Sequence, residues 1–169
     1  FSENIFNGAF IVMFGAEMFG ASVIPCGDTN PEDMINLLIS YRVTKFITTP
    51  YMALLIANTL EEKGINPQNL FLKSIILGGE IAAYYHKKRI EETLLTKVYE
   101  IYGLGEIIGP GVGGECLEQK GLHINEDHFI AEIIDPKSGQ LVDNGTTGEL
   151  VITTISREGF PLIRFRTGN

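Results

Sequence analysis

Apolar positions in the first part of the chain follow two different periods. In some segments they recur at steps of three and four residues, as on the buried face of an amphipathic helix. Short apolar runs that end at turn-forming residues lie between these segments, as expected of strands. The predicted helices span residues 4–20, 31–41, 50–62 and 82–95, and the predicted strands span residues 21–25, 45–49, 73–77 and 97–102. Strands and helices that alternate at this spacing predict a parallel sheet joined by right-handed crossovers.

The pattern changes from Gly103 onward, where glycines crowd together and the helical period disappears. Turn sequences at residues 135–139 and 143–145 are of the kind that joins antiparallel strands. The predicted strands of this part span residues 129–134, 148–154 and 162–165. We therefore expect an α/β fold in two portions, a parallel α/β portion over residues 1–105 and a small β-rich portion over residues 106–169.

The charge balance of the chain limits its partners. Thirteen basic against 21 acidic residues give a net charge of −8, which repels the phosphates of nucleic acids. The 44% hydrophobic and 20% charged composition is that of an ordinary globular protein. No apolar run approaches the roughly 20 residues that cross a bilayer. We therefore expect neither nucleic acid nor a membrane as a partner.

The cysteine content and the two ends of the chain indicate its setting. Cys26 and Cys116 are too few for a disulfide framework, which favours a reducing cytoplasm, and no signal peptide is evident. The chain opens on Phe1 within an apolar stretch and stops at Asn169, directly after a glycine. We expect a cytoplasmic protein of which this chain is an internal piece.

Two motifs lie where an open α/β sheet binds ligands, beyond the carboxyl ends of its strands. Gly78-Gly79-Glu80 follows the third predicted strand, and residues 102–106 (YGLGE) follow the fourth. Adjacent glycines let the backbone approach a flat ligand, an aromatic ring stacks on a base, and Glu106 offers the hard oxygen ligand that Mg²⁺ prefers. On its own, a Gly-Gly-Glu sequence is more often an ordinary turn, and a lone tyrosine such as Tyr102 is more often a core aromatic.

Longer stretches of the sequence resemble one enzyme family, the phenylacetate–coenzyme A ligases. The resemblance covers nearly the whole chain, and its motifs occur in the family's order. They are residues 14–25 (FGAEMFGASVIP), 102–112 (YGLGEIIGPGV), 121–129 (GLHINEDHF), 132–136 (EIIDP), 148–154 (GELVITT) and 160–168 (FPLIRFRTG). The chain thus resembles part of the large N-terminal domain of an adenylate-forming enzyme.

The resemblance implies an ATP-dependent acid–thiol ligase. Such enzymes join a carboxylate, here an aryl or arylacetic acid, to the α-phosphate of ATP and pass the acyl group from acyl-AMP to coenzyme A. Glu100 would accept a hydrogen bond from the adenine amino group, Tyr102 would stack on adenine, and Glu106 would hold Mg²⁺. The nucleotide contacts that the resemblance implies are Gly78, Gly79, Glu80, Glu100, Tyr102, Gly103 and Asn169.

Three positions depart from the family pattern. Gly105 stands where the family has serine or threonine, Asn169 stands at the ribose-binding aspartate, and Ile81 replaces a proline. The family's phosphate-binding loop lies upstream of the residues that this chain matches, and its domain with the catalytic lysine lies downstream. Residues 1–169 alone are therefore expected to bind nucleotide poorly and to catalyse little.

Three further features are interpreted from their sequence patterns, the first of them in two ways. Cys116 and His123 lie seven residues apart, and two interpretations compete for them. In the first they form half of a zinc site, which the Cys-x-Cys pair that relatives of this family carry beyond the position of Asn169 would complete. In the second they are a buried thiol and a strand histidine. Residues 86–89 (HKKR) predict a solvated helix face. The aromatic stripe of the first helix predicts core packing by its three members, Phe6, Phe10 and Phe14.

Three functions remain open at this point. The first is a coenzyme A ligase that acts on an aryl or arylacetic acid. The second is an adenylylating synthetase of a deazaflavin coenzyme, because the methanogen enzymes of that type resemble phenylacetate ligases and share the same motifs. The third is an α/β binding module without enzymatic activity.

Overall fold

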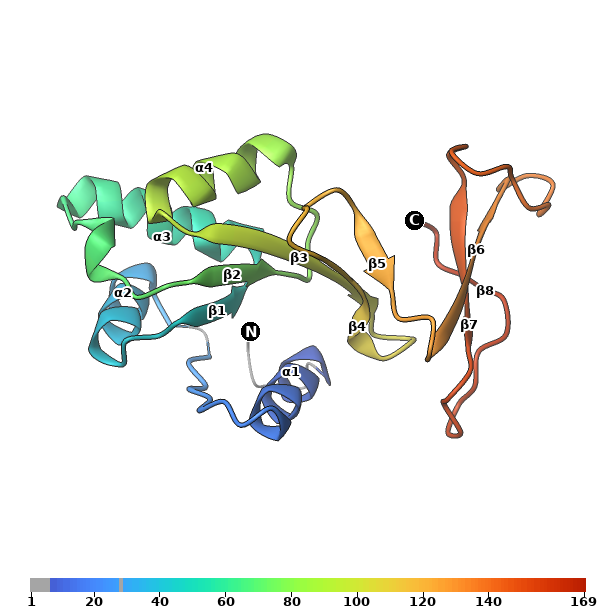
Figure 1. Cartoon of the computed structure of the whole chain (residues 1–169), viewed down its shortest axis with the longest axis horizontal. Helices are drawn as coiled ribbons and strands as arrows, with labels where there is room; N and C mark the ends of the chain where they lie inside the picture. The colour runs from blue at the N-terminus through green and yellow to red at the C-terminus, as the bar shows by residue number, and fades with distance from the viewer. Residues whose placement is uncertain (1–6, 28) are drawn as a thin grey trace. The chain divides into compact units, whose positions relative to one another are not determined.

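The computed structural model describes residues 7–27 and 29–169. They divide into two compact units, Phe1–Leu122 and His123–Asn169, shown in Figure 1. Among the described residues, no helix is both long and apolar enough to span a bilayer.

The first unit holds strands β1 to β4 of a five-stranded sheet with the order β1-β2-β3-β4-β5, and β5 crosses the boundary after Leu122. The first three strands are parallel, as predicted, and β4 runs antiparallel to β3. The strands are β1 (Lys45–Thr48), β2 (Ser74–Leu77), β3 (Lys97–Leu104), β4 (Gly109–Glu115) and β5 (Leu122–Ile124). The alternating pattern of the sequence therefore gives the predicted α/β layer.

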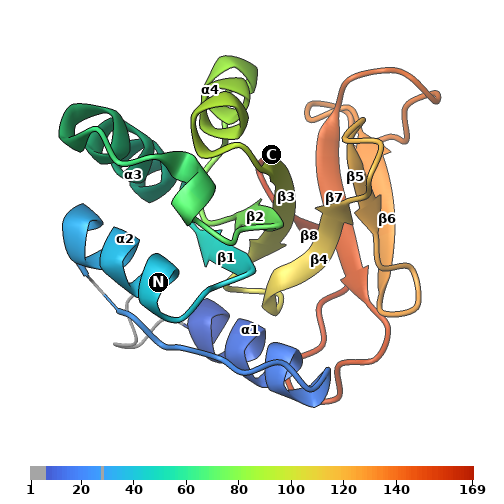
Figure 2. The same cartoon turned by 60° about the vertical axis from the view of Figure 1, so that its left-hand side comes forward.

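Three of the helices, α2, α3 and α4, cover one face of the parallel strands (Figure 2). The core lies between that face and these helices, and includes Ile35, Ile56, Ile75, Ile90 and Val98, each 0% exposed. Burial of such side chains stabilises the fold by about 1.5–3 kcal/mol each. The helices of the unit are α1 (Asn7–Met18), α2 (Pro31–Ser40), α3 (Pro50–Lys63) and α4 (Tyr84–Leu94), with a 3₁₀ turn η1 (Pro67–Asn69).

Local sequence signals set the ends of α2 and α3. The side chain of Asn30 accepts a hydrogen bond from the N–H of Asp33 at 2.9 Å, and Pro31 occupies the first helical position. The hydroxyl of Thr49 caps α3 in the same way, through the N–H of Met52 at 3.2 Å. Gly64 ends α3 at φ 62°, a left-handed conformation that glycine adopts without strain.

The structure corrects two predictions near the N-terminus. Residues 21–25 form no strand, because the N–H of Ala21 closes the end of α1 on the carbonyl of Ala16 and Pro25 has no N–H to donate. Phe10 and Phe14 do not pack in the core; they are 42% and 58% exposed and stack on each other. Phe6, the third member of the predicted stripe, lies outside the described residues.

The second unit is a three-stranded antiparallel sheet with the order β6-β7-β8, as its turn sequences predict. The strands are β6 (Phe129–Ile134), β7 (Glu149–Thr154) and β8 (Phe165–Arg166). The turn after β6 is held by the carboxylate of Asp135, which accepts from the N–H of Ser138 at 2.7 Å. This hydrogen bond, with those from the Ser138 hydroxyl and the Lys137 N–H, lowers the pKa of Asp135 although desolvation opposes the shift.

The compact units divide between Leu122 and His123, whereas the sequence pattern changes near residue 105. The reason is that β4 pairs with β3 and so belongs to the same sheet as the residues that precede it. The proposed division into portions 1–105 and 106–169 therefore stays a prediction about where the adenine-binding part of the chain ends.

Candidate functional site

The Gly-Gly-Glu turn begins where β2 ends and lies against β3. The register pairs Leu77 with Glu100, and the N–H of Gly78 donates to the carbonyl of Thr48 at 3.1 Å. A Cβ atom at Gly78 would lie 2.9 Å from Cγ1 of Ile101, closer than real Cβ contacts. Gly79 has φ +81°. The two glycines are thus needed for different reasons, the first for close approach to β3 and the second for a left-handed backbone.

The end of β3 carries Glu100 and Tyr102 on the same face, since they are two residues apart on a strand. The β3–β4 pairing shifts its register between Tyr102 and Gly103. At this shift the two backbones touch, because a Cβ at Gly103 would overlap the carbonyl oxygen of Gly109. The register therefore brings Gly78-Gly79-Glu80 to the strand end that carries Tyr102. This is the juxtaposition that the two motifs predict.

The carboxylate predicted to hold Mg²⁺ lies on the turn after β3. The N–H groups of Ile107 and Ile108 both donate to the carbonyl of Leu104, at 3.0 and 3.1 Å, and the side chain of Ile107 is fully buried. Glu106 is exposed at this anchored turn. No atom lies within 4 Å of a Cβ built on Gly105. The position that departs from the family pattern therefore has room for a serine.

A buried charge cluster joins α4, β3 and β4 behind Glu100. Lys87, on α4, pairs with the Glu115 carboxylate, and its Nζ lies 3.9 Å from Oε2 of Glu100. Oε2 of Glu115 also accepts the backbone N–H of Glu100 at 2.8 Å. Only 10% of the Lys87 side chain and 5% of the Glu115 side chain are exposed, against 30% for Glu100. The cluster thus holds both the backbone and the carboxylate of Glu100.

The prediction of a solvated helix face over residues 86–89 is wrong for Lys87, which is 8% exposed. The spacing contained the signal: Lys87, Ile90 and Leu94 are the buried residues of α4 and recur at steps of three and four. A lysine in an otherwise apolar stripe indicates a buried partner. The carboxylate that pairs with it, Glu115, comes from a distant part of the sequence and carries no motif of its own.

A second set of hydrogen bonds ties α4 to β3. Oε1 of Glu91 accepts from the N–H of Val98 at 3.0 Å and from Nε2 of Gln119 at 2.9 Å. Burial would raise the pKa of Glu91, but these hydrogen bonds and the charges of Lys97 and Lys87 outweigh it, and the pKa is lowered. Glu91 therefore fixes the loop after β4 to the strand that carries Tyr102.

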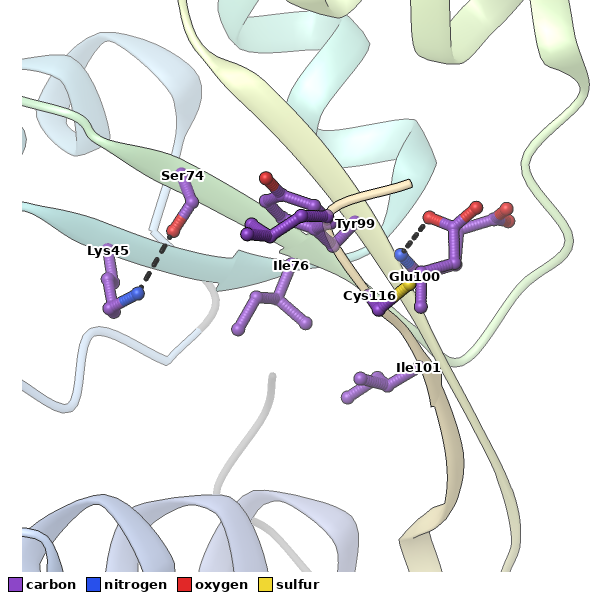
Figure 3. A pocket seen from close by; sticks show the side chains of 9 residues that line it. Lys45, Ser74, Ile76, Tyr99, Glu100, Ile101 and Cys116 are labelled. Atoms are coloured by element: carbon purple, nitrogen blue, oxygen red, sulfur yellow. Dashed lines mark hydrogen bonds between the residues drawn. The ribbon is translucent and has the colours of Figure 1, made fainter. Parts of the chain in front are cut away.

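A pocket of about 310 Å³ opens on the sheet face opposite the core (Figure 3). Tyr99 and Ile101 line it and alternate with the core residue Val98, and Nζ of Lys45 donates to the Ser74 hydroxyl at 3.3 Å on its wall. Glu100 is its one wall residue among the implied nucleotide contacts, and the carboxylate of Glu100 is directed toward Lys87. We therefore place the candidate site at the ends of β2 and β3 and not in this pocket.

Asn169 belongs to the second unit, where it is tied to β7. Its carbonyl accepts from the N–H of Leu150 at 2.9 Å, and its Nδ2 donates to the carbonyl of Thr167 at 3.3 Å. Two arginines of this unit pair with carboxylates. Nε of Arg164 lies 3.1 Å from Oε2 of Glu132, and Nε of Arg166 lies 2.9 Å from Oε2 of Glu149. The hydrogen bond from Arg166 is the main cause of the lowered pKa of Glu149.

The zinc candidates are both exposed. Cys116 is a free thiol at the surface, so the alternative of a buried thiol is wrong. His123 lies in β5, as a strand histidine would. Within residues 7–27 and 29–169, no group of three or more histidine, cysteine or acidic side chains is placed to hold a metal ion. The pairing of Cys116 with His123 in a zinc site stays a prediction.

Comparison with known proteins identifies the family. The model of the AMP-binding enzyme family matches residues 4–156, most of the chain. The chain belongs to the AMP-binding enzyme family. The resemblance of its motifs to adenylate-forming enzymes is thereby confirmed.

Curated relatives of this AMP-binding chain are named phenylacetate-coenzyme A ligases. Those of Thermus thermophilus and Pseudomonas putida are 37% and 39% identical to it, over 100% and 99% of the chain. That of Escherichia coli is 36% identical over 99% of the chain. The chain spans only 38–39% of the length of these relatives.

Solved structures share the fold. A 2-hydroxyisobutyryl-CoA ligase in complex with an acyl-adenylate has a TM-score of 0.91 and 26% identity, over 99% of this chain and 36% of that chain. A long-chain-fatty-acid-CoA ligase from Archaeoglobus fulgidus has a TM-score of 0.74 at 18% identity, over 88% of this chain and 32% of that chain. Both likenesses confirm the predicted fold class, an α/β fold with a mostly parallel sheet and a small β-rich portion.

Proposed function

We propose that the full-length protein carrying this segment is an ATP-dependent aryl-acid–coenzyme A ligase, with phenylacetate as its first candidate substrate. The observation that carries the proposal is the packing of Gly78 against Ile101, which sets the Gly-Gly-Glu turn beside the strand end of Tyr102. Relatives named phenylacetate-coenzyme A ligases match the chain over 99–100% of its length, which supports phenylacetate as the acid and coenzyme A as the thiol.

The proposed reaction has two steps. A carboxylate oxygen of phenylacetate bonds to the α-phosphorus of ATP while the bond to the β-phosphate oxygen breaks, which yields phenylacetyl-AMP and pyrophosphate. The sulfur of coenzyme A then bonds to the acyl carbon, the bond to the AMP oxygen breaks, and the thiol proton passes to solvent. A similar solved structure, 2-hydroxyisobutyryl-CoA ligase, contains both an acyl-adenylate and coenzyme A, which supports this order of steps.

Residues at the ends of β2 and β3 would bind the adenine. Backbone atoms of Gly78, Gly79 and Glu80 would border one edge of the base, and the ring of Tyr102 would stack on its face, a contact worth about 1–3 kcal/mol. The carboxylate of Glu100 would accept from the adenine amino group. Gly103 would keep the strand end close to β4, where a side chain has no room.

The single carboxylate of Glu106 suits the Mg²⁺ that accompanies ATP. Mg²⁺ in nucleotide sites is held by one or two protein carboxylates, with phosphate oxygens and water completing the shell. A three-residue metal cluster is therefore not needed, and Glu106 is exposed on an anchored turn. The ion would neutralise charge on the phosphates, and Glu106 would hold it at the end of β3.

Two departures from the family pattern would weaken phosphate and ribose binding. Gly105 has no hydroxyl for a phosphate oxygen, and the amide of Asn169 has one neutral acceptor oxygen in place of a carboxylate. A zinc site at Cys116 and His123, and a cytoplasmic location, stay predictions. The comparisons do not support the deazaflavin synthetase or the non-enzymatic module.

The proposal is tested with the purified full-length protein, ATP, Mg²⁺, phenylacetate and coenzyme A. We expect pyrophosphate release that depends on phenylacetate and a phenylacetyl-CoA product, both identified by mass spectrometry. A parallel reaction contains the deazaflavin coenzyme in place of phenylacetate. Adenylylation of the deazaflavin with no reaction of phenylacetate would contradict the proposed substrate, and no pyrophosphate release with either would contradict the proposed function.

A further inference from the structure

The buried cluster behind Glu100 contains one cation and two carboxylates. Lys87 approaches from α4, Glu115 from the end of β4, and Glu100 from β3. Two carboxylates this close repel each other unless a cation lies with them. Lys87 supplies that cation, and burial strengthens its attraction to both groups because water screens it little. The position of the Glu100 carboxylate thus depends on Lys87.

Glu115 holds the backbone of Glu100, whereas Lys87 holds its carboxylate. The Oε2 atom of Glu115 accepts the backbone N–H of Glu100 at 2.8 Å, one residue beyond the β3–β4 pair that Ile101 forms with Gly114. The backbone of Glu100 is therefore fixed by Glu115, and the carboxylate by Lys87. Glu100 is the most exposed of the three, with 30% of its side chain open to solvent. A ligand can reach Glu100, while the two residues that hold it are covered.

We infer that Lys87 and Glu115 are positioning residues that direct the Glu100 carboxylate at the six-position of the purine and so set the preference for ATP over inosine triphosphate (ITP). The inference rests on the proposed function. A carboxylate accepts a hydrogen bond from the six-amino group of adenine, whereas the six-carbonyl of hypoxanthine is itself an acceptor and is repelled. Discrimination of this kind requires an acceptor held in place, because a mobile side chain turns away from the wrong base.

The experiment uses the full-length protein with saturating phenylacetate and Mg²⁺, and measures kcat and KM of pyrophosphate release for ATP and for ITP. The wild type is expected to prefer ATP by at least about tenfold in kcat/KM, as for loss of a charge-assisted hydrogen bond. Lys87→Met should reduce this preference at least about fivefold, through a higher KM for ATP with kcat for ITP unchanged. Lys87→Arg should restore most of it.

Lys88→Met is the matched control. Lys88 follows on the same helix, its side chain is 59% exposed, and it pairs with Glu92 at 3.8 Å. Its substitution should leave the ATP preference unchanged. In a Glu100→Gln protein, Lys87→Met should cause no further change in the preference, because the two residues act as one unit. A Lys87→Met protein that keeps the wild-type preference, or that loses ATP and ITP activity equally, overturns the inference.

Two additions keep the test decisive. If Lys87→Met does not fold by circular dichroism, the double variant Lys87→Met/Glu115→Gln removes both buried charges and is held to the same outcomes. Calorimetric binding of ATP and ITP separates the inference from the function. A wild type that prefers ATP in binding but releases no pyrophosphate contradicts the proposed function alone. Pyrophosphate release with no ATP preference in the wild type contradicts the inference alone, and binding of neither nucleotide contradicts both.

Discussion

The strand ends of the first unit and the antiparallel sheet of the second unit differ in how tightly their polar and charged residues are held. At the ends of β2 and β3, buried atoms leave almost no freedom. Gly78 meets Ile101, Gly103 meets Gly109, and Glu100 is held from behind by Glu115. This region is defined by close contacts of backbone atoms with neighbouring backbone and side-chain atoms.

The second unit presents its arginines at the surface. Arg164 pairs with Glu132 and Arg166 with Glu149; 53% of each arginine side chain is exposed, against 22% of the Glu132 side chain and 11% of the Glu149 side chain. Exposed pairs of this kind contribute little, because water and salt screen them and long side chains lose freedom on pairing. The contrast indicates that substitutions at the strand ends of the first unit have large effects and those of the surface pairs have small ones.

The largest effect is expected at Gly103. Gly103→Ala places a Cβ on the carbonyl oxygen of Gly109 and should destabilise the protein by more than about 3 kcal/mol, because backbone must move to make room. Gly105→Ala is the control, since its Cβ meets no atom within 4 Å and Gly105 lies two residues further on, in the turn after β3. Chemical denaturation of both variants gives the comparison. Equal stability of the two would break the contrast between the regions.

The next effect is on catalysis, at Glu106. Glu106→Gln should lower adenylylation by the full-length protein at least about tenfold, or roughly 1.4 kcal/mol of barrier, because a neutral amide binds Mg²⁺ far less well than a carboxylate. Pyrophosphate release is measured across a Mg²⁺ titration. An unchanged rate at every Mg²⁺ concentration would remove Glu106 from the metal site.

A gain is expected at Gly105. Gly105→Ser puts a hydroxyl where the structure has open space and where the family has serine or threonine. We expect KM for ATP to fall about threefold to tenfold, the effect of one added hydrogen bond to a charged phosphate. Gly105→Ala separates the hydroxyl from the loss of glycine flexibility. A serine variant that behaves as the alanine variant does would show that no phosphate lies within reach of this turn.

The smallest effects belong to the surface pairs. Arg164→Gln should change the free energy of unfolding by less than about 1 kcal/mol at neutral pH.

Glu149 makes the free energy of unfolding depend on pH, with a sign that follows from its lowered pKa. Its pKa is lowered in the folded state, chiefly by the hydrogen bond from Arg166, so its contribution is fully present above the unfolded carboxylate pKa of about 4.3 and is lost as the pH falls through the lower pKa of the folded state. Glu149→Gln should therefore flatten the acid side of the stability profile, measured by denaturation between pH 7 and pH 3.

The sequence predicted most of the fold because its signals are local. The period of apolar positions located α2, α3, β1 and β2, and Pro31 and Gly64 marked helix ends that the structure confirms. The antiparallel sheet followed from turns such as the one at Asp135. Local signals failed where pairing decides the outcome, as in residues 21–25, which have strand-like composition but no strand in the structure.

The candidate site was predicted in part for the same reason. Motifs marked the Gly-Gly-Glu turn and Tyr102, and the register of β2 and β3 brings their strand ends together. The Lys87–Glu115 pair was missed, because its partners are 28 residues apart and meet only when β4 folds back on β3. The basic run at residues 86–89 predicted a solvated helix face. Lys87 differs from its neighbour Lys88 only because it lies on the buried face of α4, while Lys88 lies on the exposed face.

The KM for ATP in a Tyr102→Ala variant of the full-length protein tests the location of the adenine site most directly. Tyr99, on the opposite face of the same strand and on the wall of the 310 Å³ pocket, supplies the matched Tyr99→Ala control. We predict that Tyr102→Ala raises KM for ATP at least about tenfold, through loss of base stacking, and that Tyr99→Ala changes it less than about twofold. A wild-type KM in Tyr102→Ala, or a rise confined to Tyr99→Ala, would contradict an adenine site at the ends of β2 and β3.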